Sequence, residues 1–422
     1  MIFTIIVGKY QVMYIPRHLG NRLKRLLATY SCVVVSGARQ VGKSTLLRHI
    51  LMSRADFVTF DPTLDLENAR KEPDLFLANH RRPLVLDEFQ YAPELSAALK
   101  RAVDQDPRPG QFLLSGSQQW SVMKNVADSL AGRAAFLDLE GFSRAELARS
   151  NGPAWLGAWL ENPANFEKRP RQRLKERFPL WEQIWRGFLP RAQFLSLDLV
   201  RGFHEDYFRT YVERDARLSM AVDDWQAFGR FTRLCAALTA QEINLSQLGR
   251  ELGIRPDTAR RWLAGLVAGF QFHTVPAWSG NTIKRLSSHP KGHFTDTGLV
   301  CAALGLSSPK ALPLHPSWGA IFETAVASEL RKMAARLSAP PSIFHWRSHG
   351  GGEVDLVLER DGWLYPVEVK SSTHLASDCL TGIRAFRKTY PKARIQRGLV
   401  LAPLSQPLSF GPEALALPWD WE

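Results

Sequence analysis

The sequence predicts an α/β protein organised on a doubly wound parallel sheet, and three observations carry this prediction. Residues 37–44 fit the phosphate-loop pattern G-x-x-x-x-G-K-[ST] between a β-branched run and a helical stretch. Strand-like and helix-like segments alternate from there to residue 139. The apolar run Leu84–Leu86 ends in two acids, Asp87 and Glu88. A sheet of this kind binds its nucleotide at the carboxyl edge of its strands.

The phosphate loop has the residues that phosphate binding needs. Its glycines let backbone N–H groups close around phosphate oxygens, and the helix that follows adds positive potential. We expect Lys43 to reach the β- and γ-phosphates of ATP and the Ser44 hydroxyl to hold Mg²⁺. A chance loop is the alternative, which the flanking strand and helix argue against. The predicted nucleotide-binding residues are Gly37, Ala38, Arg39, Gln40, Val41, Gly42, Lys43, Ser44 and Thr45.

Hydrophobic periodicity predicts the elements around this loop. Helical segments are expected over residues 13–30 and over Leu64–Leu77. Strands are expected at Val33–Val35, Phe57–Phe60 (ending at Asp61-Pro62), Leu84–Leu86, Phe112–Ser117 and Ala135–Leu139.

Acids and serines at the strand ends bear on ATP hydrolysis. We expect the strand that ends in Asp87 to neighbour the phosphate-loop strand, so that Asp87 supports Mg²⁺ through water or Ser44. Glu88 would then polarise the attacking water. Ser115 or Ser117, at the end of another strand, could sense the γ-phosphate. The alternatives are two surface acids and a polar loop.

Composition sets the broad class. The chain has 422 residues, enough for two to four domains, with 45% hydrophobic and 23% charged residues as in ordinary globular proteins. Its formal charge of +13 favours an acidic partner such as nucleic acid, although a generally basic surface is the alternative. The cysteines are far apart, which predicts neither a zinc site nor a disulfide framework and suits a reducing cytoplasm. They are Cys32, Cys235, Cys301 and Cys379.

The N-terminal segment MIFTIIVGKYQVMYIP is apolar over about seven positions, too few for a membrane span and a poor match to a signal peptide. Met13 is an alternative translation start. No other segment predicts a span, so no membrane partner is expected.

The middle of the chain predicts helices. Residues 151–225 are expected to form a helical insertion or linker, with a basic run at 168–177. That run is either a solvated face or a phosphate contact. Residues 198–238 are amphipathic, and their aromatic side chains are expected in the core.

Residues 226–305 predict a winged helix-turn-helix domain. Leu245-Ser246 opens the first helix, Gly253 supplies the turn, and Asp257 is a plausible N-cap of a helix over 258–268. The residues expected inward are Leu248, Leu252, Trp262, Leu263 and Leu266. The residues expected outward are Arg255, Arg260 and Arg261. In a DNA-binding module these arginines face the groove or the phosphates; internal packing or assembly is the alternative.

A β-hairpin near the C-terminus carries the second chemical pattern. Asp361-Gly362 is a strong hairpin turn, and it places Asp355 opposite Glu368. Alternation puts these two carboxylates and Lys370 on one face. The opposite face, expected to meet the core, carries Val354, Leu356, Leu358, Tyr365, Val367 and Val369.

The opposed carboxylates indicate a cation site. Two such groups repel, and a divalent ion between them removes that cost. Lys370 could then orient or deprotonate a water, as metal-assisted phosphodiester hydrolysis requires. The alternative is a solvated face on which Lys370 neutralises both acids. A helix over 318–337 offers a third acid, Glu323 or Glu329.

These residues resemble known proteins. Asp355 followed by Glu368-x-Lys370 is similar to the PD-(D/E)xK restriction-endonuclease-like nucleases. The order of modules resembles AAA-type ATPases of bacteria and archaea that have a P-loop domain, a winged helix and a nuclease-like C-terminal domain of unknown function. The resemblance spans roughly residues 13–405. Its motifs are GARQVGKSTLL, LVLDEFQ, LSGS, SLAGR, YVERDAR, HFTDTGL, GAIFETAVASEL and GEVDLVLE…VEVKSS.

The resemblance implies an AAA-type ATPase domain over 13–150 and a PD-(D/E)xK nuclease-like domain over 315–410. It favours Glu323 over Glu329, so that Glu323, Asp355 and Glu368 would hold Mg²⁺ or Mn²⁺. Arg133 becomes a candidate for contacting the γ-phosphate, within the chain or across a subunit interface, and Arg214 is a second candidate. AAA-type ATPases often complete their sites from a neighbour, so a homo-oligomer is expected.

Two hypotheses about function follow. The leading one is an ATP-hydrolysing protein that acts on nucleic acid, on DNA more than RNA, with a Mg²⁺-dependent nuclease-like domain. The other is a nucleotide-driven regulatory switch that binds DNA or protein without cleaving. A helix-turn-helix repressor alone would leave both chemical patterns unexplained.

Overall fold

The protein forms two compact units. The structure is a computed structural model that describes residues 4–7, 10–60, 66–119, 129–168, 173–212, 224–281, 283, 285, 288–348 and 350–421. Unit 1 comprises residues 1–142 and 268–270, and unit 2 comprises 143–267 and 271–422. Among the described residues, no helix has the length and apolar character that crossing a bilayer requires.

Unit 1 is built on the predicted parallel sheet. Its strands are β3 (Cys32–Ser36), β4 (Asp56–Thr59), β5 (Leu84–Asp87), β6 (Phe112–Gly116) and β7 (Ala134–Asp138). Every pairing is parallel, and the order is β4-β5-β6-β3-β7. The inner strands β3, β5 and β6 are buried along their whole length, which is why they read as continuous apolar runs.

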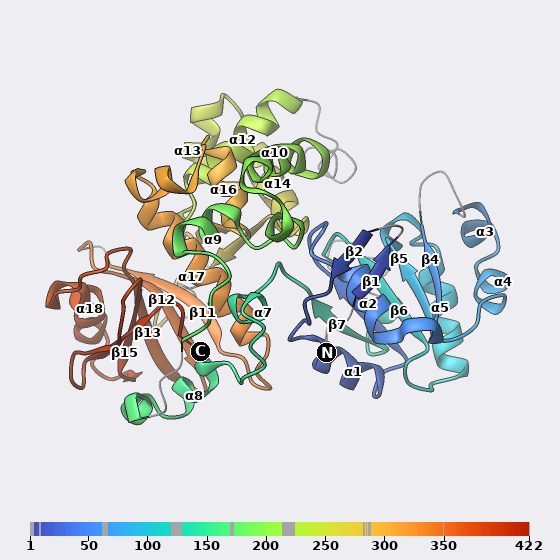
Figure 1. Ribbon diagram of the computed structural model, residues 1–422, viewed down its shortest axis with the longest axis horizontal. Coiled ribbons are helices and arrows are strands. Elements are labelled where there is room, and N and C mark those ends of the chain that lie inside the picture. The colour runs from blue at the N-terminus through green and yellow to red at the C-terminus, as the bar shows by residue number, and fades with distance from the viewer. Residues whose placement is uncertain are drawn as a thin grey trace. The chain divides into compact units, whose positions relative to one another are not determined.

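Helices pack against this sheet, as Figure 1 shows. They are α1 (Gly20–Leu27), α2 (Lys43–Leu51), α3 (Leu66–Lys71), α4 (Pro73–Ala78) and α5 (Leu95–Gln105), with short 3₁₀ turns at Met52–Arg54 and Phe89–Tyr91. A core cluster joins α3, α4 and α5 to the strands. A separate hairpin, β1 (Thr4–Val7) with β2 (Tyr10–Met13), precedes α1.

Two predicted helices have different bounds. The helix expected over 13–30 begins only at Gly20, because Met13 ends a strand and Pro16 favours extended backbone before it. The stretch expected over Leu64–Leu77 divides at Pro73, which starts a new helix where its missing N–H costs nothing. Asp61-Pro62 lies outside the described residues.

Unit 2 contains the helical middle of the chain and a second sheet. Its helices are α7 (Arg144–Leu147), α8 (Trp155–Glu161), α9 (Leu180–Arg186), α10 (Leu197–Tyr207), α12 (Trp225–Ala237), α13 (Leu245–Leu252), α14 (Pro256–Ala268), α16 (Thr297–Ala303), α17 (Trp318–Ala334) and α18 (Thr381–Thr389). Shorter turns lie at Pro163–Lys168, Arg191–Phe194, Pro309–Leu314 and Ser377–Leu380, and a π-helical turn at Phe208–Val212.

A helix-turn-helix segment stands beside a small antiparallel sheet of β8 (Gln241–Glu242), β10 (Lys291–Phe294) and β9 (Phe272–Val275), in that order. The Asn244 side chain caps α13 by accepting from the Gln247 N–H at 3.0 Å, and Gly253 ends it at φ 68°. Asp257 is not the expected N-cap, because α14 already begins at Pro256.

The C-terminal sheet has the order β11-β12-β13-β15-β17-β16, with β14 beside β13. Its strands are β11 (Ser342–Arg347), β12 (Glu353–Arg360), β13 (Trp363–Val369), β14 (Arg394–Ile395), β15 (Gly398–Ala402), β16 (Leu408–Ser409) and β17 (Ala414–Pro418). The predicted hairpin register is confirmed from Leu356 opposite Val367 to Arg360 opposite Trp363. Asp361 and Gly362 have φ of 55° and 76°, as a tight hairpin turn requires.

Candidate functional site

The phosphate loop joins β3 to α2 in unit 1. Gly37 has φ 150° and Gly42 has φ 94°, and a side chain at position 37 would overlap the backbone oxygen of Leu139. Only glycine fits there. The Lys43 side chain is buried, and its Nζ donates to the carbonyl oxygens of Gly37 and Ala38 at 2.8 and 2.9 Å. The ammonium is thus held over the loop in which phosphates would bind.

Asp87 is held by two serines. The Ser44 hydroxyl donates to Asp87 Oδ2 at 2.6 Å, and the buried Ser115 hydroxyl donates to Asp87 Oδ1. The expectation that β5 neighbours β3 is wrong, because β6 lies between them and contributes Ser115. Ser44 and Asp87 nevertheless meet, and two adjacent oxygen ligands fit the Mg²⁺ that accompanies ATP.

Glu88 follows Asp87 in left-handed backbone conformation, at φ 55°. Its Oε2 accepts from Gln90 Nε2 at 2.5 Å and from the Ser117 hydroxyl at 3.4 Å. A glutamate in this conformation costs roughly 1 kcal/mol, and such strain clusters at functional sites. The two serines therefore have different partners. Ser115 contacts Asp87, and Ser117 lies beside Glu88.

Arg133 lies at the end of the sheet where the parallel strands begin, and the phosphate loop lies at the end where they finish. It precedes Ala134, which pairs with Cys32 at the start of β3, whereas the loop follows the other end of β3. Its Nε donates to Asp104 Oδ1 at 2.6 Å. Contact with the γ-phosphate of its own chain is therefore excluded, and a role across a subunit interface stays a prediction. Arg214 lies outside the described residues.

Arg17 is a contributor that the sequence did not indicate. Its Nη1 donates to Val41 O at 2.7 Å, and its Nη2 donates to Glu140 O at 2.6 Å. The guanidinium lies 4.9 Å from the centre of the Phe142 ring. Arg17 thereby ties the phosphate loop to the segment after β7. No local pattern marks it, because its partners come from distant parts of the sequence.

The arginines of the helix-turn-helix segment are exposed, as predicted: Arg255, Arg260 and Arg261. Opposite them Trp262 and Leu266 are buried, and the Trp262 ring packs edge-on against Phe228 and Phe231 of α12. Arg260 forms an exposed ion pair with Asp257 at 2.9 Å.

The predicted basic run is partly described. Residues 169–172 lie outside the described residues. Arg173 is paired within the chain, its Nη2 lying 2.5 Å from Asp420 Oδ2. Arg177 lies over the Phe178 and Phe194 rings.

The structure brings together the four residues predicted for the site at the hairpin. Glu323 comes from α17, Asp355 from β12 and Glu368 from β13, and Lys370 follows β13 directly. Asp355 Oδ2 accepts from the Val369 N–H at 2.7 Å, and Lys370 Nζ donates to Glu368 Oε2 at 2.9 Å. Burial, followed by repulsion from Asp355, raises the pKa of Glu368 to about 8. The same two causes raise the pKa of Glu323 to about 8.

The charged face of the hairpin is buried rather than open, which corrects the expectation from alternation. The Glu368 side chain is only 3% exposed. Helix α18 covers it, and a side chain at Gly382 would overlap Glu368 Oε1 and the Glu353 backbone oxygen. Glu329, the alternative third acid, lies elsewhere and accepts from the Arg144 N–H at 3.2 Å.

Two further residues, Glu353 of β12 and Lys291 of β10, complete this group. We call it the acidic cluster: Glu323, Glu353, Asp355 and Glu368 with Lys291 and Lys370. Lys291 Nζ lies 2.7 Å from Glu353 Oε1, 2.9 Å from Glu323 Oε1 and 3.7 Å from Asp355 Oδ1. Burial disfavours its charge, but the three carboxylates outweigh burial and raise the pKa of Lys291 above its ordinary value. No local pattern predicts this contact.

A divalent ion does not fit the acidic cluster in this arrangement. Lys291 contacts Glu323 and Asp355, and Lys370 contacts Glu368. Within the part of the chain that the structure describes, no three His, Cys, Asp or Glu side chains are placed to hold a metal.

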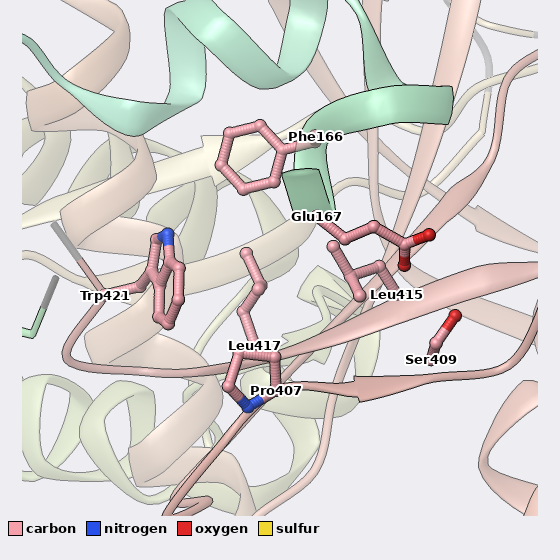
Figure 2. A pocket seen from close by; sticks show the side chains of 7 residues that line it. All are labelled: Phe166, Glu167, Pro407, Ser409, Leu415, Leu417 and Trp421. Atoms are coloured by element: carbon pink, nitrogen blue, oxygen red, sulfur yellow. The ribbon is translucent and has the colours of Figure 1, made fainter. Parts of the chain in front are cut away.

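Figure 2 shows a small pocket elsewhere in unit 2, with Phe166, Leu417 and Trp421 in its wall. Its polar groups are satisfied within the chain, since Arg397 Nη2 donates to Glu167 Oε2 at 3.1 Å and to the Ser409 hydroxyl at 2.8 Å. Its lining offers no pair of groups suited to catalysis.

Comparison with known proteins agrees with the chemistry of unit 1. Residues 29–148 match the family described as an AAA domain, so they form an AAA-type P-loop ATPase domain. Residues 177–310 and 318–420 each match a domain of unknown function, DUF8612 and DUF4143.

Two relatives align over 408 residues at 28% identity, covering 96% of this chain and 83% of each relative. They are uncharacterized proteins of Mycobacterium tuberculosis (Rv2008c) and Mycobacterium bovis (Mb2031c). Among solved structures, the Walker-type ATPase PABY2304 of Pyrococcus abyssi aligns at 15% identity with a TM-score of 0.37, over 68% of this chain and 94% of that one. A TM-score this low does not establish a common fold.

Proposed function

We propose that this ATPase is a nucleotide-driven switch that binds nucleic acid, DNA in preference to RNA, without cleaving it. The observation that carries the proposal is the outer face of α14. Three exposed arginines stand on or next to the second helix of a helix-turn-helix whose inner face is packed, and a three-stranded sheet lies beside it. These features support a winged helix, a module whose second helix enters the major groove of DNA.

The ATPase site supplies the energy of the switch. Lys43 binds the β- and γ-phosphates, and Ser44 with Asp87 would hold Mg²⁺, which neutralises phosphate charge when bound with ATP. Glu88, kept in place by Gln90 and Ser117, orients the attacking water and accepts its proton. The Ser115 hydroxyl keeps Asp87 turned toward Ser44.

The proposal is tested with the full chain and a fluorescently labelled duplex. The variant Arg255→Ala/Arg260→Ala/Arg261→Ala should weaken duplex binding at least tenfold. The slope of the logarithm of the binding constant against the logarithm of the salt concentration should become shallower by about 0.9 for each phosphate that the arginines no longer neutralise. The control removes three other exposed cations of unit 2, through Arg191→Ala/Lys388→Ala/Lys392→Ala. Equal weakening in both variants would mean that the duplex is held by general positive charge and not by these three arginines, which would contradict the proposal. Unaltered binding in the Arg255→Ala/Arg260→Ala/Arg261→Ala variant would refute it as well.

A second candidate is a metal-dependent nuclease, favoured by Asp355, Glu368 and Lys370 meeting Glu323. It predicts Mg²⁺- or Mn²⁺-dependent cleavage of DNA or RNA that disappears in Asp355→Ala and Lys370→Ala. Intact substrates across a broad panel, with ATPase activity retained, would exclude it. The ion pairs of Lys291 make the non-cleaving switch the better supported function.

A further inference from the structure

We propose that Lys291 is the built-in cation of the acidic cluster, and that its ammonium excludes divalent ions from the carboxylates of α17 and β12. The inference rests on the proposed function and deepens it, since it gives a physical reason why the C-terminal domain would not cleave. It concerns Lys291 and metal exclusion, and it can fail while DNA binding stands.

The first support is geometric. The Lys291 side chain is 2% exposed and reaches carboxylates from two separate elements, Glu323 on α17 and Glu353 on β12, within 3 Å. An ammonium at this place occupies the volume and the lone pairs that a metal would need. A divalent ion added at the same point would meet it at close range and be repelled.

The second support is the charge balance. The cluster holds four carboxyl groups, two of which (Glu323 and Glu368) have a raised pKa, and two ammonium groups, so Lys291 supplies half of its positive charge. A buried carboxylate without a partner is costly, and a paired one is tolerated. Lys291 therefore does for Glu323, Glu353 and Asp355 what a bound cation would otherwise do.

The third support is that β10 is fixed in place. Lys291 pairs in register with Glu242 of β8 and Val275 of β9. His293, also on β10, lies 3.3 Å through Nδ1 from the Thr324 hydroxyl of α17. A side chain at Gly292 would overlap the Phe272 ring, so the strand sits close against its neighbour. The backbone of Lys291 is therefore held beside the carboxylates by strands on both sides.

The test counts bound Mn²⁺ by electron paramagnetic resonance in the full chain without nucleotide. All proteins share the Ser44–Asp87 site, so differences report on the acidic cluster. Wild type and Asp355→Asn should bind the same number of ions. Lys291→Met should gain one Mn²⁺, and Lys291→Met/Asp355→Asn should lose it again. Mn²⁺ should also raise the unfolding temperature of Lys291→Met by more than it raises that of wild type, which has only the Ser44–Asp87 site.

Lys332→Met is the matched control, because it removes another nearly buried ammonium of unit 2 that lies over the Phe188 ring at 4.4 Å, outside the acidic cluster. It should gain no ion. If Lys291→Met does not fold, Lys291→Gln keeps a donor for Glu323 and Glu353 and should gain the same ion.

Two results would overturn the inference. One is a folded Lys291 variant that gains no Mn²⁺. The other is a wild type that loses an ion on Asp355→Asn, which would show a metal bound while Lys291 is in place; this arm needs no Lys291 variant. Duplex binding, measured on the same proteins, is expected to be unchanged, so a failure of the DNA proposal is recognised separately.

Discussion

At the scale of single residues, the orientation of the Asp87 carboxylate in unit 1 depends on the hydrogen bonds that it accepts. Asp87 has one oxygen turned to Ser44 and the other to Ser115, so its orientation depends on hydroxyls from α2 and β6. Hydrogen bonds to a charged acceptor contribute about 1.5–3 kcal/mol. The positioning of Asp87 is therefore expected to respond to a change in either serine.

We expect Ser115→Ala to lower kcat for ATP about 10- to 100-fold, the equivalent of one charge-assisted hydrogen bond, with ATP affinity nearly unchanged. Steady-state ATPase kinetics with a separate nucleotide-binding assay would measure this. Ser96→Ala is the control, because Ser96 is also buried but bonds to Pro93 O at the start of α5. A Ser115→Ala enzyme with full kcat would contradict the assigned role.

Buried histidines in unit 2 predict sensitivity to acid. Burial, with a smaller effect of Lys291, lowers the pKa of His345 from 6.5 to about 4. Between these two pKa values the unfolded chain binds a proton at His345 and the folded protein does not. The free energy of unfolding therefore keeps its full value with respect to His345 above pH 6.5 and decreases as the pH falls toward 4. His273 and His293, whose pKa values are also lowered by burial, act in the same direction.

Between pH 7 and pH 5, we expect His345 alone to reduce the free energy of unfolding of unit 2 by about 2 kcal/mol. Denaturant unfolding at several pH values would measure the loss. His345→Gln cannot titrate and can still donate to His289 O, so the loss should shrink by that amount. An unchanged pH dependence would show that His345 does not control it.

At the scale of elements, helix α18 closes one side of the C-terminal sheet. Leu380 and Ile383 pack with Val400 and Ala416, and Phe386 packs with Val357. Gly382 lies where the helix approaches the Glu353 backbone and Glu368. The absence of a side chain at this position allows α18 to cover the acidic face of the hairpin.

Gly382→Ala should therefore destabilise unit 2 by about 3 kcal/mol, the upper range for forced overpacking. Gly202→Ala, within α10, is the control: no heavy atom lies within 4 Å of the added methyl group, and alanine favours helix. That variant should be neutral or slightly more stable. Urea unfolding of both proteins checks the pair, and equal midpoints would argue against close contact at α18.

At the scale of the whole molecule, Arg133 bears on assembly. It stands at the amino edge of the parallel sheet, away from the phosphate loop of its own chain. We propose that the protein self-associates and that Arg133 acts on the nucleotide of a neighbouring copy. A head-to-tail interface of this kind places one surface against a different one on the next subunit.

Mixing two inactive variants tests this arrangement. Lys43→Ala lacks a working loop but keeps Arg133, and Arg133→Ala keeps its loop. If the arginine is supplied by the neighbour, random mixing should restore about a quarter of wild-type ATPase activity, because one complete site forms in each mixed pair. An Arg133→Ala protein that is fully active alone, or a mixture that stays inactive, would contradict the proposal.

Local sequence patterns determined the parts of this protein whose partners lie close in the chain or in a regular repeat. Periodicity, and turn residues such as Gly253 and Asp361-Gly362, predict the phosphate loop, the buried strands of unit 1, the β12–β13 register and the exposed arginines on or next to α14. These features depend on backbone geometry that a few neighbouring residues specify.

Only the tertiary structure decided which distant residues meet. Strand order placed β6 between β3 and β5 and so gave Asp87 a second serine. The parallel pairing of β7 with β3 placed Arg133 at the end of the sheet away from the phosphate loop of its own chain. The packing of unit 2 laid α18 over the acidic face. Above all, that packing brought Lys291 of β10 to the carboxylates of α17 and β12. A buried charge takes its partner from whatever packing brings near, and sequence separation carries no record of that choice.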